Sequence, residues 1–443
     1  MEKDFIRRES EHYDYPQLCK YQDKTGAFSL KNKELNEKET AMYIHVPFCK
    51  TFCVFCNYYK IRTRISDEII SQYENAILTE IDFYSKREDI PKRISCVHFG
   101  GGTPSVLPSR VLDSIITKIK DCFIVDDNCE MSMEGNIRDL SVKDYTDGLA
   151  DVGINRISFG VQTLQSDIRK RYGLHSDISI IYNSYNNLIH AGINNCNVDI
   201  MYGFPEQNPN EVISDIEEMI GLGVNCIDLY ALNVFPNTDL YKKFKFEDKL
   251  KIYKDSENLK KYYSVYEYFY NNVNFVMSNT ISSRTTDACK YLKIHLGNNM
   301  IDGGNVIGIG PSAKGNIGRY HYKNHVSFED YLKQVSISRN GINLYDEISE
   351  QEAIRRVLVL FPNFNYLNRE VIKLEETDQI LIDQLIENEY ISVNEHEYRL
   401  TCKGMFYAGN ISSLFYSSEQ KQKMTRSTIY NMSNKVNFYN QDK

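Results

Sequence analysis

The sequence predicts an α/β fold: a partial (β/α)6 TIM-like barrel followed by a C-terminal, mainly helical, winged-helix-like domain. From residue 41, short apolar runs with strand character alternate with longer helical patterns, which is typical of parallel β–α units. Six such units are too few for a closed eight-unit barrel, so we expect a partial one. From about residue 345 the pattern changes to helices followed by two short strand-like runs, which favours a separate domain.

The barrel elements follow in chain order. The expected strands are Met42–Val46, Ile94–Phe99, Cys129–Glu134, Asn155–Gly160, Asn194–Met201 and Asn225–Leu232. The expected helices between them are Ser66–Lys86, Ser109–Asp121, Ser141–Val152, Ile178–Ala191 and Asn210–Leu222. Several of these helices begin at a Ser or Asn cap and some end near a glycine. Two further strands, Val273–Ser278 and Val306–Gly310, are expected later, and the second opens into the glycine-rich loop GIGPSAKGNIG.

We expect three regions along the chain. Residues 1–40 form a polar N-terminal arm, residues 41–320 form the barrel with its extension (substrate side 236–320), and residues 345–443 form the C-terminal domain. The expected C-terminal helices are Glu350–Leu360, Asn368–Leu374, Thr377–Glu387 and Met405–Leu414. The stretch ISVNEHEYRLTCKG, before the last helix, is expected to form two strands joined by a polar turn.

Composition narrows the class of protein. The 443-residue chain has a formal net charge of −8 and a pI near 5.7, whereas nucleic-acid-binding proteins usually carry a basic excess. It contains neither the long apolar run of a membrane span nor the apolar segment of a secretory signal. We therefore expect a cytoplasmic protein with no nucleic-acid or membrane partner. Disulfides are rare in that compartment, so a cluster among the eleven cysteines indicates metal binding or catalysis.

Chemically capable residues follow all six expected strands. In a parallel barrel, active groups gather at the carboxyl ends of the strands. The ends carry, in order, the cysteine stretch YIHVPFCKTFCVFCNYY, the run Gly100–Gly101–Gly102–Thr103–Pro104, Glu134, Gln162, Asp199, and Ala231 with Asn233. Their shared location predicts one site more strongly than any single residue does.

The first strand is followed by Cys49, Cys53 and Cys56. A structural zinc site needs four ligands, and no fourth Cys or His follows at a suitable spacing. Iron–sulfur clusters normally take four thiolates, so three would leave one iron open to a ligand. The alternative is three ordinary core cysteines. We expect Phe48, Phe52 and Phe55 to keep water and oxygen from the thiols.

The glycine run and the two carboxylates suit a small polar ligand. Gly100–Gly102 lacks both dinucleotide and P-loop patterns, but glycine lets a ligand approach the backbone N–H groups. Glu134 could accept a hydrogen bond from an ammonium group, and Asp199 could bind a ribose diol. The alternatives are a tight turn for the glycines and helix-capping roles for the carboxylates.

These residues resemble a known family. The spacing Cys49-x3-Cys53-x2-Cys56, with Phe55 before the last cysteine, is similar to the cluster loop of radical S-adenosylmethionine (SAM) enzymes. The stretches GGGTPS, NRISFGVQ and VDIMYGFPEQ resemble the oxygen-independent coproporphyrinogen III dehydrogenase branch. IDLYALNVFPNT, SNTISSRTT, GIGPSAKG and LTCKGMFYAGNI are most similar to the anaerobic haem-utilisation proteins, the anaerobilin synthase-like methyltransferases.

The resemblance implies a site and a chemistry. Cys49, Cys53 and Cys56 would hold a [4Fe–4S] cluster whose open iron binds SAM, and one electron would yield a 5′-deoxyadenosyl radical. A second SAM would supply a methyl or methylene carbon. The positions that match family contacts to SAM are Tyr43, Phe55, Gly101, Gly102, Thr103, Glu134, Gln162, Asp199 and Ala231.

Three departures bear on the substrate. Relatives place an Arg at the position of Leu174, where Arg171 or His175 could substitute. Haem-utilisation relatives have a His-Trp pair at Thr280-Ile281, while the following Arg284–Thr286 are retained. Lys314 stands where relatives are often uncharged, and we interpret it as a surface lysine.

Four functions remain open on this reasoning. The favoured hypothesis is methyl or methylene transfer to haem or another planar tetrapyrrole, with ring opening and iron release. The alternatives are oxidative decarboxylation of coproporphyrinogen III, a natural-product methylase or cyclopropane-forming enzyme, and a haem chaperone without turnover. The enzymatic alternatives share a flavodoxin-like or other low-potential electron donor as partner.

Overall fold

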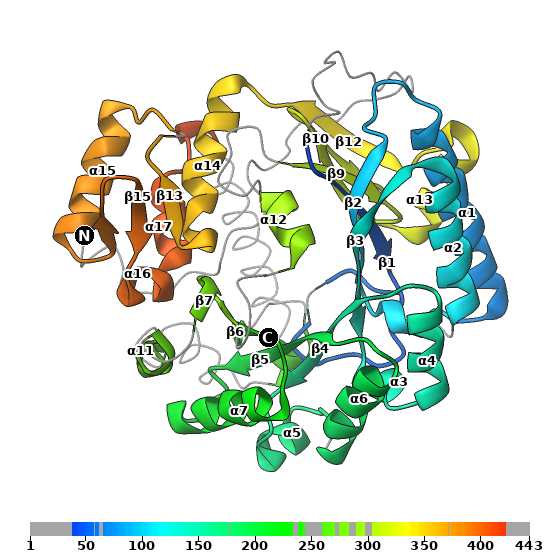
Figure 1. Ribbon diagram of the computed structural model, residues 1–443, viewed down its shortest axis with the longest axis horizontal. Coiled ribbons are helices and arrows are strands. Elements are labelled where there is room, and N and C mark those ends of the chain that lie inside the picture. The colour runs from blue at the N-terminus through cyan, green and yellow to red at the C-terminus, as the bar shows by residue number, and fades with distance from the viewer. Residues whose placement is uncertain are drawn as a thin grey trace, which may run out of the picture.

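A computed structural model describes residues 38–421 except 57, 62–64, 176, 234–237, 244–258, 271–273, 283–288, 297–303 and 371. Its centre is one twisted sheet whose six main strands are parallel and neighbour one another in chain order (Figure 1). These strands are β1 (Thr40–Val46), β2 (Arg93–Gly101), β3 (Ile124–Gly135), β4 (Arg156–Gln162), β5 (Asn195–Tyr202) and β6 (Cys226–Ala231). The predicted α/β partial barrel with a helical C-terminal region is confirmed.

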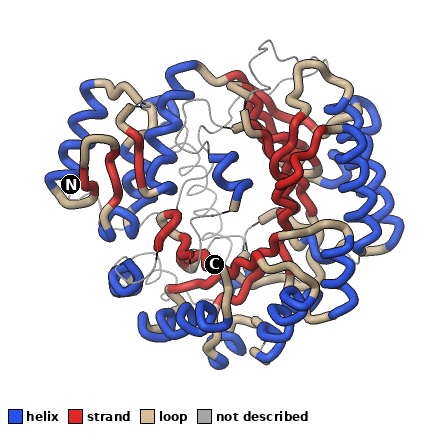
Figure 2. Tube along the Cα trace, in the orientation of Figure 1, coloured by secondary structure: helices blue, strands red, loops and turns tan. Residues whose placement is uncertain are grey.

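Helices cover the convex side of this sheet (Figure 2). They are α1 (Asp67–Ser85), α2 (Ser109–Cys122), α3 (Ile137–Leu140), α4 (Lys143–Asp151), α5 (Ser166–Arg171), α6 (Ser179–His190) and α7 (Pro209–Leu222), with a short 3-10 turn, η2 (Pro104–Val106). The Ser66 hydroxyl caps α1 by accepting from the Ile69 amide, and Asn208 with Glu211 forms a capping box on α7. The expected helix Ser141–Val152 begins two residues later, after the separate turn of α3.

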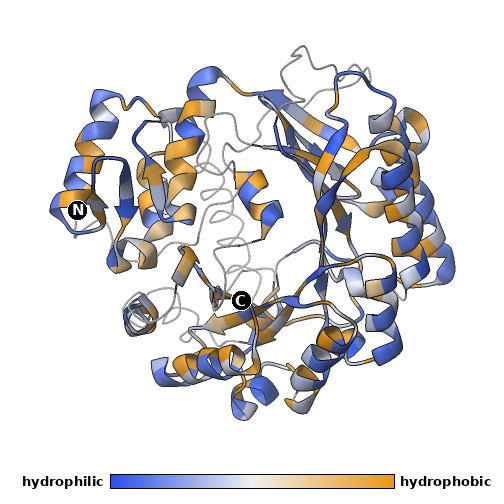
Figure 3. Ribbon diagram, viewed as in Figure 1, coloured by the Kyte–Doolittle hydropathy of each residue, from blue (hydrophilic) through white to orange (hydrophobic). Residues whose placement is uncertain are grey.

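Apolar side chains fill the space between sheet and helices. The outward-pointing residues of β1, such as Met42, Ile44 and Val46, pack with Ile77 and Ile81 of α1 in one large core. Figure 3 shows the result as alternating hydrophobic and hydrophilic faces along the outer helices. The inward-pointing residues of the strands are instead mostly polar, which leaves chemistry-bearing groups inside the barrel.

Further strands extend the sheet at both edges. On one side β9 (Asn305–Ile309) pairs in parallel with β1, and three antiparallel strands follow: β10 (Lys314–Ile317), β11 (Tyr320–Asn324) and β12 (Ile342–Glu347). On the other side β8 (Thr280–Ser282) and β7 (Asn274–Met277) follow β6. GIGPSAKGNIG is therefore not a loop throughout, because it begins in β9 and its second half contains β10. Lys314 begins β10 and is half-buried.

The C-terminal region is mainly helical, with a small sheet. Its elements are α14 (Glu350–Phe364), β13 (Tyr366–Asn368), α15 (Glu376–Glu387), β14 (Ile391–Val393), β15 (Glu397–Leu400), α16 (Cys402–Phe406) and α17 (Ala408–Leu414). The predicted helix Asn368–Leu374 is wrong: Asn368 ends β13, which pairs with β15, and its side chain turns the chain by accepting from the Glu370 amide.

Four other named helices are described: α8 (Asp239–Lys243), α11 (Tyr263–Tyr270), α12 (Lys290–Leu296) and α13 (Phe328–Ser338). Of the expected N-terminal arm only residues 38–40 are described, and Thr40 already begins β1. Among the described helices, none has the length and apolar character that crossing a bilayer requires.

Glu80 of α1 fastens the sheet extension to the barrel. Its carboxylate is fully buried and accepts hydrogen bonds from the Gly310 and Gly341 amides, the Tyr331 hydroxyl and the Asn324 side chain, all at 2.8–2.9 Å. Burial raises the pKa of Glu80 to about 7, against the opposing effect of these four donors. One side chain thus joins a helix of the first β–α unit to segments more than 200 residues later.

We expect Glu80→Gln to change how stability depends on pH. In the folded wild type, Glu80 keeps its proton up to about pH 7, whereas in the unfolded chain it releases the proton above about pH 4.3. The unfolding free energy of the wild type therefore falls by about 1.4 kcal/mol per pH unit between these two values. Glutamine cannot ionise, so the variant lacks this pH dependence. Its NH2 group, however, faces two hydrogen-bond donors, and the variant should therefore be about 2 kcal/mol less stable than the wild type at pH 5. Denaturant unfolding at pH 5 and pH 8 should show that this deficit is lost at the higher pH. Glu68→Gln, on the exposed face of α1, should leave the wild-type slope unchanged, and a deficit independent of pH would contradict the prediction.

Candidate functional site

The cysteine loop lies at the carboxyl end of β1 and is anchored on both sides. The Ile61 amide donates to Pro47 O at 2.9 Å, and Phe48 forms an isolated bridge with Ile61. Val54 and Phe55 pack on a small apolar cluster at the ends of β5 and β6, made by Ile168, Tyr172, Met201, Phe204, Leu232 and Leu240. The loop is therefore positioned by both ends of the open barrel.

The three thiols of the loop differ in exposure. Cys49 is buried, Cys56 is intermediate and Cys53 is exposed. Burial raises the pKa of Cys49, while the Thr103 hydroxyl, 3.3 Å from its Sγ, and the Lys60 ammonium oppose that shift. Desolvation by the surrounding loop is the main cause that raises the pKa of Cys53, to about 11. The charges of Cys56 and then Cys49 add to this shift, so the three thiols are electrostatic neighbours.

This donor set fits an iron–sulfur cluster better than a single metal ion. Within the described part of the chain, no group of three or more His, Cys, Asp or Glu is placed to hold one metal ion. A cubane cluster has a different requirement, because each thiolate binds a different iron and the sulfur atoms stand apart. Three thiols on one loop, with the Thr103 hydroxyl and the Lys60 ammonium beside Cys49, supply the three thiolates that such a cluster would need.

The predicted shield of three phenylalanines is corrected in part. Phe52 is 37% exposed, with the Lys60 ammonium 5.9 Å from its ring, so it does not exclude water. Phe48 is buried, but its ring packs on Tyr73 and Phe328 in the core. Only the half-buried Phe55 remains as a candidate shield.

The glycine run after β2 forms a tight backbone cradle beside the thiols. The Gly102 amide donates to Val46 O at 2.7 Å, and the Thr103 amide donates to Phe48 O at 2.8 Å. Gly101 has φ +116°, and a Cβ there would lie 2.7 Å from the His45 ring. This backbone therefore requires glycine at position 101.

Glu134 joins the run from β3. Its Oε2 accepts from the Gly101 amide at 3.2 Å, and its Oε1 lies 3.7 Å from His98 Nε2. The Tyr43 hydroxyl is 3.0 Å from His45 Nδ1, and burial lowers the pKa of His45 to about 4, so that ring is neutral. Tyr43, Gly101 and Glu134, predicted as one site, are thus brought together by β1, β2 and β3.

Gln162 ends β4 in an unusual backbone conformation. Its φ is +69°, in the left-handed region that non-glycine residues seldom occupy. The buried Arg169 guanidinium donates to the carbonyls on either side of it, Val161 O and Thr163 O, both at 2.7 Å. Asp215 of α7 accepts from the Thr163 hydroxyl at 2.6 Å. The sequence did not predict roles for Arg169 and Asp215, because no motif marks a residue whose buried polar contacts form only in the fold.

We expect Arg169→Gln to unfold at a lower denaturant concentration than the wild type. The change removes a charged donor from three buried or half-buried carbonyls, those of Val161, Thr163 and His175, and should cost about 3 kcal/mol. Arg171→Gln is a matched control two residues away, because Arg171 is exposed and pairs with Glu206. Equal stability of the two variants would show that Arg169 does not hold this turn.

Asp199 lies inside the barrel beside a second carboxylate, Asp228 of β6. Burial is the main cause that raises the pKa of both carboxyl groups, and the charge of Asp228 raises the pKa of Asp199 further. The Arg156 guanidinium opposes the shift of both groups. Asp228 accepts from the Asn197 amide at 2.9 Å and from the Thr280 hydroxyl. Thr280, where the resemblance places a histidine in relatives, is therefore part of this buried network.

The remaining predicted residues fall near this end of the barrel. Ala231 is the last residue of β6, paired with Tyr202 of β5. Leu174 is half-buried, and Arg171 is exposed and bonded to Glu206, while His175 Nδ1 faces Asp177 O at 3.3 Å. The retained residues 284–286 lie outside the described part of the chain.

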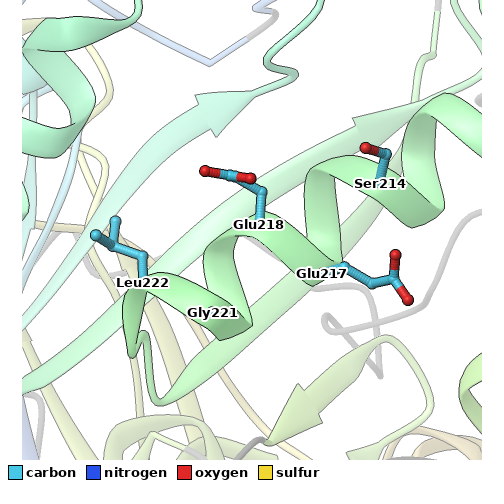
Figure 4. Close-up of a pocket in the computed structure, with 5 residues that line it drawn as sticks. All are labelled: Ser214, Glu217, Glu218, Gly221 and Leu222. Atoms are coloured by element: carbon cyan, nitrogen blue, oxygen red, sulfur yellow. The ribbon is translucent and has the colours of Figure 1, made fainter.

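A surface hollow elsewhere does not compete with this site. Figure 4 shows it on α7, where Ser214, Glu217, Glu218, Gly221 and Leu222 line it. Tyr268 donates to Glu217 and Tyr182 donates to Glu218 at 3.1 Å, so both carboxylates serve contacts between elements.

Comparison with known proteins identifies a family for part of the chain. Residues 43–219 match the family model of the Radical SAM superfamily. The chain therefore contains a radical SAM domain, and this domain spans the cysteine loop and the ends of β1–β5.

The chain is also similar to two characterised relatives and to one solved structure. Anaerobilin synthase of Escherichia coli O157:H7 is 27% identical over 326 residues, 73% of this chain and 71% of that protein. Heme chaperone HemW of Lactococcus lactis subsp. lactis is 25% identical over 389 residues, 86% of this chain and 98% of that protein. The structure of coproporphyrinogen III oxidase (HemN) from Escherichia coli, described as a radical SAM enzyme, superimposes with a TM-score of 0.71 at 22% identity, covering 85% of this chain and 90% of that one. The last comparison establishes the fold.

Proposed function

We propose that this protein is a radical SAM enzyme that transfers a methyl or methylene carbon to a planar tetrapyrrole, with haem as the preferred substrate. The observation that carries the proposal is the three-thiol loop lying against the Gly101–Thr103 cradle, in a chain that resembles anaerobilin synthase over most of its length. When bound, a [4Fe–4S] cluster supplies the electron that cleaves the SAM sulfonium bond. Cys49, Cys53 and Cys56 are the residues that hold it.

The surrounding residues have distinct roles in this proposal. The Thr103 hydroxyl and the Lys60 ammonium favour the Cys49 thiolate. Glu134 orients the Gly101 amide and offers its free carboxylate edge to the SAM ammonium group. Asp199 accepts from the ribose hydroxyls, and Gln162, Phe55 and Ala231 border the same space. Tyr43 closes it on the side of β1.

Two carboxylates inside the barrel favour a second SAM site. Asp199 and Asp228 form an acidic pair in the barrel, and a cationic sulfonium compound is attracted to such a pair. We propose two SAM sites, the first at the cluster with Asp199 at its ribose, and the second on the Asp228 side of this pair. A low-potential donor such as a flavodoxin provides the electron.

A second candidate function is haem binding and delivery without turnover. It is favoured by one observation, the alignment with HemW over nearly the whole length of that protein. A chaperone would bind haem without forming 5′-deoxyadenosine. Thr280 and Ile281 stand where the resemblance places a His-Trp pair, and both are buried. In either function, haem would therefore have to bind without that pair.

Product analysis tests the proposal directly. We expect anaerobically reconstituted protein, given SAM, a low-potential reductant and haem, to form 5′-deoxyadenosine and a tetrapyrrole that has gained one methyl carbon by mass. Loss of carbon dioxide from coproporphyrinogen III in a parallel reaction would assign the decarboxylase activity instead. Tight haem binding with no deoxyadenosine would assign the chaperone function.

A further inference from the structure

Helix α12 lies inside the molecule, between the barrel strands and the C-terminal region. Figure 1 shows it in the space enclosed by the sheet and α14. It packs on β1, β2 and β9, and Ile294 joins Ala41 and Val306 in a small buried cluster. A seven-residue helix is marginal by itself, so its position depends on what holds it.

The N-terminus of α12 is held by a carboxylate from the barrel wall. Glu130 of β3 accepts from the Lys290 amide with both oxygens, at 3.1 and 3.2 Å. The Cys289 thiol lies 3.5 Å from Glu130 Oε1, and Arg156 stands 4.0 Å from the other oxygen. A negative charge at this end complements the helix dipole.

The C-terminus of α12 is held by an arginine from the C-terminal region. Arg356 of α14 is buried and donates to Leu296 O at 3.2 Å and to His295 O. A positive charge at this end again complements the dipole. Opposite charges from two parts of the fold therefore clamp one short helix.

The side of α12 facing the site carries an aromatic stack. The Tyr291 ring lies 4.6 Å from His98 at 7° and 5.3 Å from Tyr43 at 18°, measured between ring centroids and planes. The His295 ring also stacks with Tyr291, at 5.6 Å and 14°. Tyr43 and His98 are the rings that border Gly100 and Glu134.

We propose that Tyr291 is a positioning residue for the SAM site, and that Arg356 makes its placement depend on the C-terminal region. The inference rests on the proposed function, since it takes Tyr43 as a contact of SAM. A shift of α14 would move the carbonyl end of α12, and the stacked rings would carry that shift to Tyr43 and His98. The C-terminal region thereby sets the affinity for SAM through one helix.

The experiment compares two neighbouring arginines of α14 in cluster-loaded protein. Arg356→Gln removes the clamp, whereas Arg355→Gln alters an ion pair with Asp378 inside the C-terminal region and serves as the control. Hydrogen–deuterium exchange of residues 290–296 and the Kd for SAM are measured anaerobically on the same samples. Arg356→Gln should speed exchange and raise the Kd by about tenfold each, the effect of one charge-assisted contact. Arg356→Lys should recover part of both effects.

Two variants at Tyr291 separate positioning from general stability. Tyr291→Phe keeps the stacked ring and should bind SAM as the wild type does, while Tyr291→Leu should lose about tenfold in affinity with unchanged iron content. Unchanged exchange in Arg356→Gln would refute the clamp, and faster exchange with wild-type Kd would refute the link to the SAM site. Failure of the wild type to bind SAM would instead overturn the proposed function and, with it, the link to Tyr43.

Discussion

Replacing Cys49, Cys53 or Cys56 singly by alanine should abolish both the iron–sulfur chromophore and the formation of 5′-deoxyadenosine. The reconstituted wild type should absorb broadly at about 400 nm and hold about four irons per chain. Each alanine variant removes one of three thiolates, and the neighbouring residues offer no replacement at suitable spacing. Iron content, the absorption spectrum and single-turnover product formation measure the result.

Cys122 and Cys402 supply matched controls, because both are partly buried free thiols remote from the loop in sequence. Their alanine variants should retain cluster and turnover. If an alanine variant of the loop still cleaved SAM, the assignment of these three residues would be wrong. Loss of the cluster in the control variants as well would point to general instability of the reduced protein.

Asp199→Asn should weaken SAM binding by about 100-fold, the loss expected when charge-assisted hydrogen bonds to two ribose hydroxyls become neutral ones. The structure adds a second expectation. Burial and the neighbouring charge of Asp228 raise the pKa of Asp199, so the pair tends to hold a proton when the site is empty. A cationic ligand favours the ionised form, and binding should therefore release a proton.

Calorimetry in two buffers of different ionisation enthalpy measures that proton. The wild type should show a buffer-dependent binding enthalpy, and Asp199→Asn should show much less. Asp228→Asn is the informative comparison, because its carboxylate is occupied by Asn197 and Thr280. It should release less than a full proton but keep most of the affinity. Equal losses of affinity in both variants would contradict a specific ribose contact for Asp199.

The sequence predicts the alternating part of the fold well, for a physical reason. Each β–α unit of the barrel is local, so apolar runs and caps such as Ser66 and Asn208 mark its elements. The ends of parallel strands meet at one edge, so the glycine run and Glu134 could be assigned to one site from the strand pattern, whereas Tyr43 was added by the family resemblance. The three cysteines were visible because their spacing is itself the signal.

The remainder depends on distant pairings. Nothing near Val306 shows that β9 will lie beside β1, or that Glu80 will accept hydrogen bonds from Gly310 and Gly341. Arg169 looks like one more basic residue in the segment RKR, although it alone turns inward there. Buried polar contacts of this kind form only in the packed tertiary structure, so the pattern of neighbouring residues does not predict them.

The pairing of β1 with β9 bears on how the protein must be made. Residues 43–219 carry the matched domain, yet a fragment ending there would leave one side of β1 as an open edge strand with unpaired backbone groups. The strand that presents the thiols is complete only after about 260 further residues have left the ribosome, because its partner begins at Asn305. Iron–sulfur insertion should therefore be a late event that follows the synthesis of β9, and truncated versions that stop before β9 should aggregate rather than acquire the cluster.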